Sequence, residues 1–172
     1  MVLADCKALA PELTVLDYDE AEPNKLLTAL AEWCIRFSPC ISIELPNVLI
    51  LDASGCTHLW GGEENYLNDI HKKFDAFGYM IRSAMADTIG TAWAVCHYGN
   101  DRSIIETGKE VKALATLPAA ALRLEPVVLE KLDKLGLKTI GSFMMMPNSA
   151  LKRRFGQSIL MRLAQAFGEE ME

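Results

Sequence analysis

The stretch Val48-Leu-Ile-Leu-Asp-Ala-Ser-Gly-Cys-Thr-His-Leu-Trp-Gly-Gly62 decides how the rest of the chain can be interpreted. It opens on four branched apolar residues, Val48 to Leu51, which is typical of a short strand covered on both faces. Asp52 ends that run, and Ser54-Gly55 supplies turn chemistry directly afterwards. A carboxylate at a strand end beside a glycine can hold a metal ion or a phosphate. It can also simply accept backbone N–H bonds and cap the turn, and the residues alone favour this second interpretation.

Hydrophobic periodicity places secondary structure around this stretch. One or two helical turns are expected over Leu3–Leu9, and residues 13–16 are strand-like. The following elements are a helix over about 26–37, a strand over 40–44 in a hairpin with 48–51, a helix from Glu63, a strand over 78–86, a helix capped by Asp87-Thr88 and a short strand near Ile104. This order predicts an α+β fold with helices on one side of an antiparallel-dominated sheet.

From Leu114 onward the pattern is helical only. Pro126 starts a helix at its first position, Gly136 ends it in the left-handed conformation, and Leu137 closes the hydrophobic contact. Further helices are expected over 140–146 with Thr139 as the cap, over 150–155 and, after Gly156, over 158–167.

Size and composition exclude several classes of protein. The chain has 172 residues with 51% hydrophobic content, which is enough for one buried core. No apolar run approaches the ~18 residues of a membrane span, and no secretion signal opens the chain. The five cysteines (Cys6, Cys34, Cys40, Cys56, Cys96) are odd in number and show no C-x-x-C spacing. We therefore expect reduced thiols, most of them buried, in a cytoplasmic protein without a zinc site.

Charge is distributed unevenly along the chain. The net charge of −6 counts against nucleic acid as a partner. Residues 123–162, however, carry eight Lys/Arg against three Asp/Glu, a local net charge of +5. A basic C-terminal part on an acidic body is typical of a protein that holds a phosphate backbone at one place. An ordinary solvated helical surface is the alternative.

Several segments resemble the Y-family (UmuC-like) translesion DNA polymerases, and within them the ImuB-like branch. Asp52-Ala-Ser-Gly and Leu59-Trp-Gly-Gly are similar to the family's second palm strand and the turn after it. Other pieces follow in the family's order: Ala31-Glu-Trp-Cys-Ile-Arg-Phe-Ser-Pro39, Ala86-Asp-Thr-Ile-Gly-Thr-Ala-Trp-Ala94, Leu117-Pro-Ala-Ala-Ala-Leu-Arg-Leu124, Leu135-Gly-Leu-Lys-Thr-Ile-Gly141 and Arg154-Phe-Gly156. Each piece is short, but together they extend from about Leu3 to Gly168.

The resemblance implies a division into domains. Residues 1–17 correspond to a remnant of the fingers, 18–115 to a palm, 116–168 to an all-α helix-hairpin-helix thumb and 169–172 to a linker stub. The family's first palm strand and its little-finger domain have no counterpart in the chain.

The resemblance also locates the family's catalytic positions. Active members hold two magnesium ions with palm carboxylates, and their Asp-Glu pair aligns with Asn47 and Val48 here. An amide binds such a metal poorly and valine offers no ligand, so we expect no metal site, no cofactor and no catalysis; Mg²⁺ would enter only if the full-length protein were active. The ImuB-like branch is implied to be a non-catalytic adaptor in translesion DNA repair and the SOS response. It works beside a separate polymerase and a recombinase-like partner.

The thumb can still contact DNA. Helix-hairpin-helix elements present backbone N–H groups to phosphates, and nearby cations strengthen the contact without reading sequence. The candidate residues are Gly136, Lys138 and Thr139 in the first hairpin and Lys152, Arg153 and Arg154 beside the second. Gly136 and Thr139 are equally well explained as helix caps.

Three alternatives stay open. The full-length protein can be an active nucleotidyltransferase, or the chain can be a protein-interaction module without DNA binding; uncovered palm flanks also predict some self-association. Gly61-Gly-Glu-Glu64 is similar to the signature of nucleotide cyclases, but that signature lies in a β-hairpin, whereas Glu63 is expected to open a helix. Isolated histidines and the absence of a Ser/His/Asp pattern predict no other active site.

Overall fold

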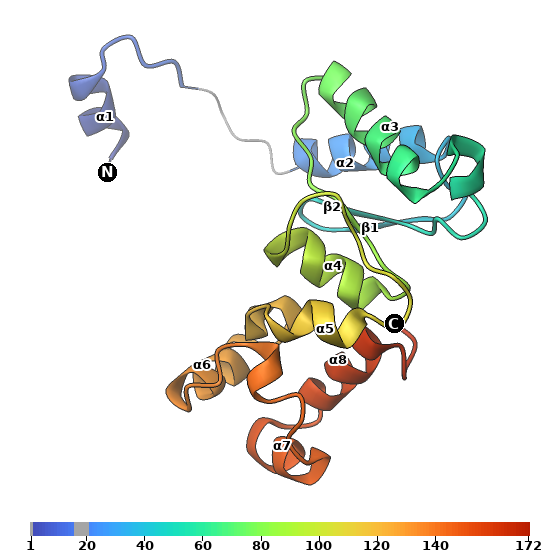
Figure 1. Ribbon diagram of the computed structural model, residues 1–172. Helices are drawn as coiled ribbons and strands as arrows, with labels where there is room; N and C mark the ends of the chain where they lie inside the picture. The colour runs from blue at the N-terminus through green and yellow to red at the C-terminus, as the bar shows by residue number, and fades with distance from the viewer. Residues whose placement is uncertain (1, 16–20) are drawn as a thin grey trace. The chain divides into compact units, whose positions relative to one another are not determined.

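The computed structural model describes residues 2–15 and 21–172. Between Ala53 and Ser54 the chain divides into two compact units, which are described separately. Figure 1 shows both, coloured along the chain. Of the strand-like segment 13–16, residues 13–15 have no regular secondary structure and Leu16 lies outside the described residues, as does the expected domain boundary near residue 17.

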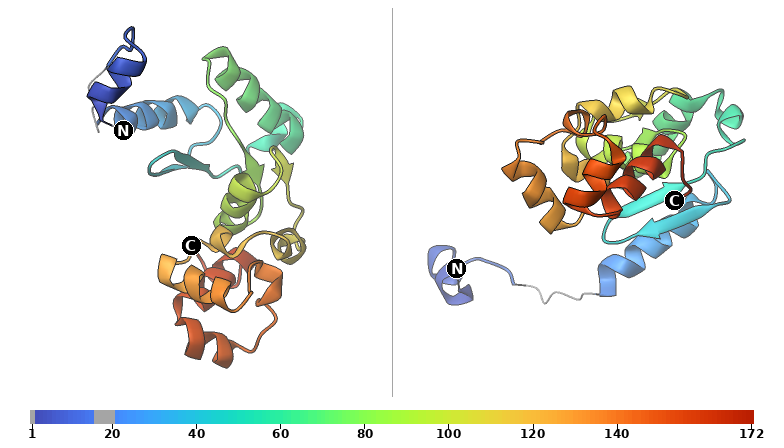
Figure 2. Two further views of the ribbon diagram at one scale, coloured as in Figure 1. Left: turned by 90° about the vertical axis from the view of Figure 1, so that its left-hand side faces the viewer. Right: turned by 90° about the horizontal axis from the view of Figure 1, so that it is seen from below.

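The first unit contains the expected hairpin. Its elements are α1 (Leu3–Leu9), α2 (Ala21–Cys34), β1 (Ile41–Glu44) and β2 (Val48–Leu51). The strands pair antiparallel, with Ile41 opposite Leu51 and Glu44 opposite Val48, and Figure 2 shows them side by side. The hairpin predicted from the alternating pattern is therefore confirmed.

A buried hydroxyl connects the end of α2 to the hairpin. Ser38 is 1% exposed, and its Oγ donates to the carbonyl groups of Cys40 and Asp52. The same Oγ accepts the N–H of Cys40 at 3.1 Å. Because the hydroxyl both donates and accepts hydrogen bonds, its burial is well tolerated, and these bonds fix where the chain enters β1.

The second unit begins with short elements around one long helix. They are the 3₁₀ turn η1 (Thr57–Trp60), α3 (Glu63–Ala76), β3 (Ala84–Met85), α4 (Ile89–Tyr98) and β4 (Ser103–Ile104). Glu63 opens α3 as expected, so the hairpin that a cyclase signature requires is not formed there. Thr88 caps α4 by accepting the N–H of Thr91, which confirms the predicted cap.

The expected sheet is only partly formed. The fold is α+β, but the described strands make two separate pairs, β1–β2 antiparallel and β3–β4 parallel, and not one antiparallel-dominated sheet with helices on one face. The strand predicted over 78–86 is reduced to Ala84–Met85, and Met80 is 99% exposed. Within the described residues β3 pairs only with β4, so the residues before it have no neighbouring strand to bond with.

The rest of the second unit is helical, as predicted. Its elements are α5 (Glu110–Ala115), η2 (Ala119–Leu122), α6 (Pro126–Lys134), η3 (Ile140–Ser142), α7 (Asn148–Phe155) and α8 (Ser158–Phe167). Figure 1 shows α4 to α8 gathered into one group. Their shared core includes the fully buried side chains of Leu114, Leu132, Ile140, Phe143, Leu151 and Ile159. Within the described residues no helix is long and apolar enough to cross a membrane.

The helix predicted over 140–146 is wrong. Only the 3₁₀ turn Ile140–Ser142 forms, and the Thr139 side chain does not cap it. Instead the backbone beside Thr139 pairs with the segment before η2: the N–H of Ile140 donates to Leu117 O, and the Lys138 carbonyl accepts the N–H of Ala119, both at 2.9 Å. Buried Phe143 anchors the turn in the core, so tertiary contacts replace the regular helix.

Candidate nucleic-acid interface

The first hairpin uses its glycine N–H internally. Gly136 has φ +71°, the left-handed conformation predicted for it. Its N–H donates to Asp133 O, and the next N–H, from Leu137, donates to Leu132 O, both at 2.9 Å. These bonds close the end of α6. Gly136 therefore shapes the turn but does not offer its own N–H to a phosphate.

The two following N–H groups are available. In the part of the chain that the structure describes, the backbone N–H groups of Lys138 and Thr139 donate to no carbonyl. Lys138 is exposed and Thr139 half-buried, and the pairing with Pro118 holds this backbone in an extended form. Two adjacent donors beside an exposed ammonium group make a small anion-binding surface.

The second hairpin presents three exposed cations. Lys152, Arg153 and Arg154 lie in the last turn of α7, where they also complement the negative end of that helix. No ion pair with another described residue involves any of the three. Gly156 follows with φ +94°, and α8 then begins without a side-chain cap, so that the N–H groups of Ser158 and Ile159 have no backbone acceptor among the described residues.

Not all of the basic segment is available to a ligand. Arg123 and Arg162 both bind the carboxylate of Glu172, and Lys134 lies 4.0 Å from Glu130. The positive charge available to a ligand is therefore smaller than the local net charge of +5 suggests. Among the described residues, the exposed cations of the two hairpins without an ion pair are Lys131 on α6, Lys138, and the α7 group Lys152, Arg153 and Arg154.

Asn47 and Val48, the residues that the sequence resemblance aligns with the family's catalytic pair, lie in the first unit. Asn47 is an exposed residue of the turn between β1 and β2, and Val48 is the first residue of β2. Glu44 lies directly across from Val48, so its side chain shares a face with Val48. No group of three or more His, Cys, Asp or Glu residues that could hold a metal ion occurs among the described residues.

A Ser/His/Asp cluster does form, although no pattern in the sequence predicts it. His71 Nε2 lies 2.8 Å from Ser83 Oγ and 3.9 Å from an Asp101 oxygen, and the Ser83 N–H donates to the same Asp101 carboxylate. Burial, and secondarily the charge of Arg102, lowers the pKa of His71. In a catalytic triad opposite ring nitrogens contact the serine and the carboxylate. Here one nitrogen faces both, so the cluster is structural.

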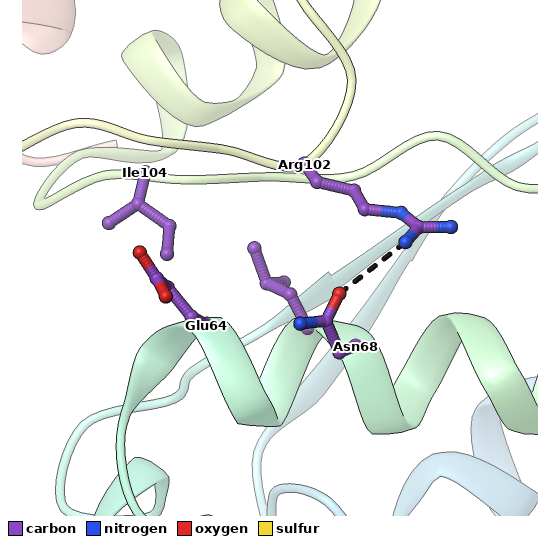
Figure 3. A pocket seen from close by; sticks show the side chains of 5 residues that line it. Glu64, Asn68, Arg102 and Ile104 are labelled. Atoms are coloured by element: carbon purple, nitrogen blue, oxygen red, sulfur yellow. Dashed lines mark hydrogen bonds between the residues drawn. The ribbon is translucent and has the colours of Figure 1, made fainter.

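A shallow pocket beside this cluster has polar walls. Figure 3 shows Glu64 and Asn68 on α3 facing Arg102 and Ile104, and Arg102 donates to the Asn68 side chain at 3.4 Å. Leu67 completes the lining. Arg102 also lies 3.8 Å from an Asp101 oxygen, and the lining residues supply neither a nucleophile nor a set of metal ligands.

The cysteines depart from expectation. All five are free thiols, but only Cys34 is buried, and Cys40 is exposed. The prediction that most are buried is wrong because Cys6, Cys56 and Cys96 lie on half-covered parts of the surface. Burial raises the pKa of both Cys34 and Cys96, which makes these thiols less reactive.

Comparison with known structures defines the class of fold. The chain resembles DinB from Sulfolobus solfataricus with a TM-score of 0.73 and 14% identity, over 98% of this chain and 51% of that one. It resembles Dbh in a ternary complex with partially disordered substrates equally well, with a TM-score of 0.73 and 14% identity over 100% and 53% of the two chains. The fold is therefore that of the Y-family DNA polymerases.

Sequence comparison identifies relatives within this class of proteins. No protein-family model matches the chain. Over 169 residues it is 42% identical to the protein ImuB of two Caulobacter vibrioides strains, an alignment that covers 98% of this chain and 37% of each relative. The chain is an ImuB homologue, as its sequence pieces suggested, and it spans a little over a third of the length of the curated relatives it matches.

Proposed function

We propose that this chain is the part of an ImuB-like protein that holds DNA without performing catalysis, and that it works as an adaptor in translesion DNA repair. One observation carries the proposal. The exposed cations Lys138, Lys152, Arg153 and Arg154 have no acidic partner among the described residues, and Lys138 adjoins two backbone N–H groups, its own and that of Thr139, that donate to no carbonyl in the described part of the chain. Such a surface binds phosphates without reading bases.

The non-catalytic part of the proposal rests on the hairpin turn. Two-metal phosphoryl transfer needs carboxylates that hold the ions at fixed positions. Asn47 supplies a neutral amide on an exposed turn, and Val48 supplies a methyl group. Glu44 shares a face with Val48 but is a single carboxylate. Mg²⁺ would therefore be a cofactor only in a full-length protein that brings further ligands.

The family's domain names are carried over as part of the same proposal. Residues 1–17 are a fingers remnant, 18–115 a palm, 116–168 a thumb and 169–172 a linker stub. The helical group η2 to α8 supports the thumb assignment, because both expected hairpins lie in it. The proposed partners are DNA, a separate polymerase and a recombinase-like protein, and the free thiols favour a cytoplasmic location.

Charge reversal tests the DNA contact. Lys152, Arg153 and Arg154 are changed together to Glu, and binding of labelled primer–template DNA is followed by fluorescence anisotropy at low salt. We expect the affinity to fall at least about tenfold, because three phosphate contacts are lost. A matched control changes Lys72, Lys109 and Lys112, which are exposed on α3 and around the start of α5. Equal losses in both variants would show that only net charge matters.

Primer extension tests the enzymatic alternative. The full-length protein is incubated with primer–template DNA, nucleotides and Mg²⁺, and a variant that restores Asn47→Asp and Val48→Glu is compared with it. Our account predicts no extension by the natural protein. Primer extension by the natural protein, with Asn47 and Val48 in place, would establish a nucleotidyltransferase and overturn the adaptor proposal.

Exposed apolar side chains support a second candidate function, protein interaction. Leu59 is 72% exposed, Met80 99% and Met145 83%. Large exposed apolar side chains are common at protein interfaces, and they also favour self-association. Sedimentation at increasing concentration tests self-association, and a monomer at every concentration would contradict it. Binding to a partner protein without any affinity for DNA would instead favour a pure interaction module.

A further inference from the structure

Arg123 lies at the centre of a network that joins three parts of the second unit. It follows η2 in the left-handed conformation, with φ +52°. Its guanidinium group lies 5.2 Å from the centre of the Trp93 ring on α4, a cation–π distance. It also binds the carboxylate of Glu172, which follows α8. The left-handed conformation ends η2, where the Arg123 N–H donates to Ala120 O.

A second arginine converges on the same carboxylate oxygen. Arg162 Nη1 lies 2.8 Å from Glu172 Oε1, the atom that Arg123 also contacts. The three side chains are mostly covered: Arg123 is 15% exposed, Arg162 28% and Glu172 16%. Two largely desolvated guanidinium groups around one oxyanion are the arrangement that binds a phosphate as well as a carboxylate.

Aromatic side chains adjoin this anion site. The rings of Trp93 and His97 are stacked, with centroids 3.8 Å apart and planes 19° from parallel. His97 and the neighbouring Tyr98 are exposed, so the stack presents aromatic surface to solvent. The buried Nε1 of Trp93 has no hydrogen-bond partner among the described residues. A cation pair beside exposed aromatic rings is the combination that single-stranded nucleic acids bind through phosphate and base.

The Glu172 carboxylate occupies the anion site in the structure. The chain after α8 folds back, with the N–H of Glu169 donating to Ala164 O and the Gln165 amide donating to Met171 O. These few contacts hold the described residues after α8, whereas Trp93 and Arg162 are half-buried residues within the helices α4 and α8. The carboxylate can therefore leave while the two arginines stay in place.

We propose that Arg123 and Arg162 form a phosphate site for single-stranded nucleic acid, that Glu172 closes this site in the absence of the nucleic acid, and that a base stacks on the Trp93–His97 pair. This inference extends the proposed DNA function to a second, regulated contact separate from the hairpins. If the carboxylate fills the site about nine-tenths of the time, removing its charge raises the apparent affinity about tenfold.

The test compares two single substitutions of equal charge. Glu172→Gln removes the competing carboxylate, and Glu169→Gln removes an exposed charge of the same segment that makes no side-chain contact among the described residues. Binding of a labelled twelve-nucleotide oligothymidine is measured by anisotropy, with circular dichroism to verify folding. We expect Glu172→Gln to tighten binding about tenfold and Glu169→Gln to change it less than about twofold. Equal effects of the two would overturn the proposal.

Further variants separate this site from the hairpins. Arg123→Gln added to Glu172→Gln is expected to abolish the gain, whereas the gain is expected to persist when Lys152, Arg153 and Arg154 are reversed to Glu. Oligothymidine should also quench Trp93 fluorescence, identified as the part of the signal lost in Trp93→Phe. A gain that survives Arg123→Gln, or that disappears only with the α7 cations, would assign the effect to the hairpins and contradict a second site.

Discussion

His71 is the residue whose charge state most directly affects the folded chain. Its ring is 3% exposed and hydrogen-bonded to Ser83, and its pKa is lowered, chiefly by burial. Arg102 lowers the pKa further, whereas Asp101 and Asp75 act in the opposite direction. The unfolded chain therefore takes up a proton that the folded chain excludes. The free energy of unfolding should fall as pH drops below 6.5, the ordinary pKa of histidine, and His71 adds no pH dependence above it.

Urea unfolding at several pH values checks this expectation. The natural chain should lose stability between about pH 6.5 and 5, and His71→Gln, which cannot be protonated, should show a shallower dependence in that window. The variant will be less stable at neutral pH by about 1–3 kcal/mol, because a buried hydrogen bond is changed. Equal slopes for the two chains would mean that other groups control the pH dependence.

Cys34 and Cys40 should differ strongly in reactivity although they are close in sequence. Cys34 is 2% exposed and burial raises its pKa, whereas Cys40 is exposed. Alkylation requires an accessible thiolate, so Cys40 should react at least about tenfold faster in the folded chain. Peptide mass spectrometry after timed alkylation measures both rates at once. Similar rates that also match those in urea would show that the α2 end does not protect Cys34.

Some roles of single residues could be predicted from the sequence, and others could not. The helix caps and turn glycines of this chain act locally, and Thr88 and Gly136 do what their types predict. The ion pair between Arg123 and Glu172 joins residues that are 49 positions apart in the sequence, and no sequence pattern predicts it. The His71–Ser83–Asp101 cluster was missed for the same reason, because its members come from separate elements.

At the scale of elements, the turn η3 depends on a close backbone approach. A Cβ atom placed on Gly141 would lie 2.7 Å from the Ala115 carbonyl oxygen, which belongs to α5. Because the obstacle is backbone, the side chain cannot be accommodated without moving one element. Gly141→Ala should lower the free energy of unfolding by about 1–3 kcal/mol.

Chemical denaturation of two variants measures this effect. Ser149→Ala serves as the comparison, since Ser149 is exposed in the first turn of α7 and its loss should change stability by less than about 0.5 kcal/mol. If Gly141→Ala is no more destabilising than Ser149→Ala, the contact between η3 and α5 is looser than described.

The elements also show where sequence reasoning ends. Helices with a clear apolar face, such as α3 and α6, begin where their patterns predict. The predicted strand 78–86 and the predicted helix 140–146 both failed, each for a tertiary reason. A strand requires a neighbouring strand, and among the described residues none pairs with residues 78–82. Around Thr139 the N–H of Ile140 donates to Leu117 O and the Lys138 carbonyl accepts the N–H of Ala119, and only a 3₁₀ turn follows.

At the scale of the whole molecule, the second unit should fold alone. Its buried apolar cluster is contributed entirely by residues between Ala94 and Ala166, and the division of the chain falls between Ala53 and Ser54. A fragment of residues 54–172 should therefore show helical circular dichroism and a cooperative thermal transition. A non-cooperative fragment would mean that its core needs the first unit.

The charge pattern is the whole-molecule feature most directly connected to function. The sequence placed a basic segment on an acidic body, and the structure distinguishes cations that are already paired from those that are not. Arg123 and Arg162 are held by Glu172, whereas Lys152, Arg153 and Arg154 have no acidic partner among the described residues. DNA binding by the proposed thumb should therefore depend on a few phosphate contacts and decrease steeply with salt.

The salt dependence of primer–template binding tests this central claim most directly. Affinity is measured by anisotropy over a salt series for the natural chain and for the variant with Lys152, Arg153 and Arg154 changed to Glu. The slope of log affinity against log salt should become shallower by about 2–3 units in the variant, since each phosphate contact contributes about 0.9. Equal slopes, or no binding by the natural chain even at low salt, would contradict DNA contact through the second hairpin.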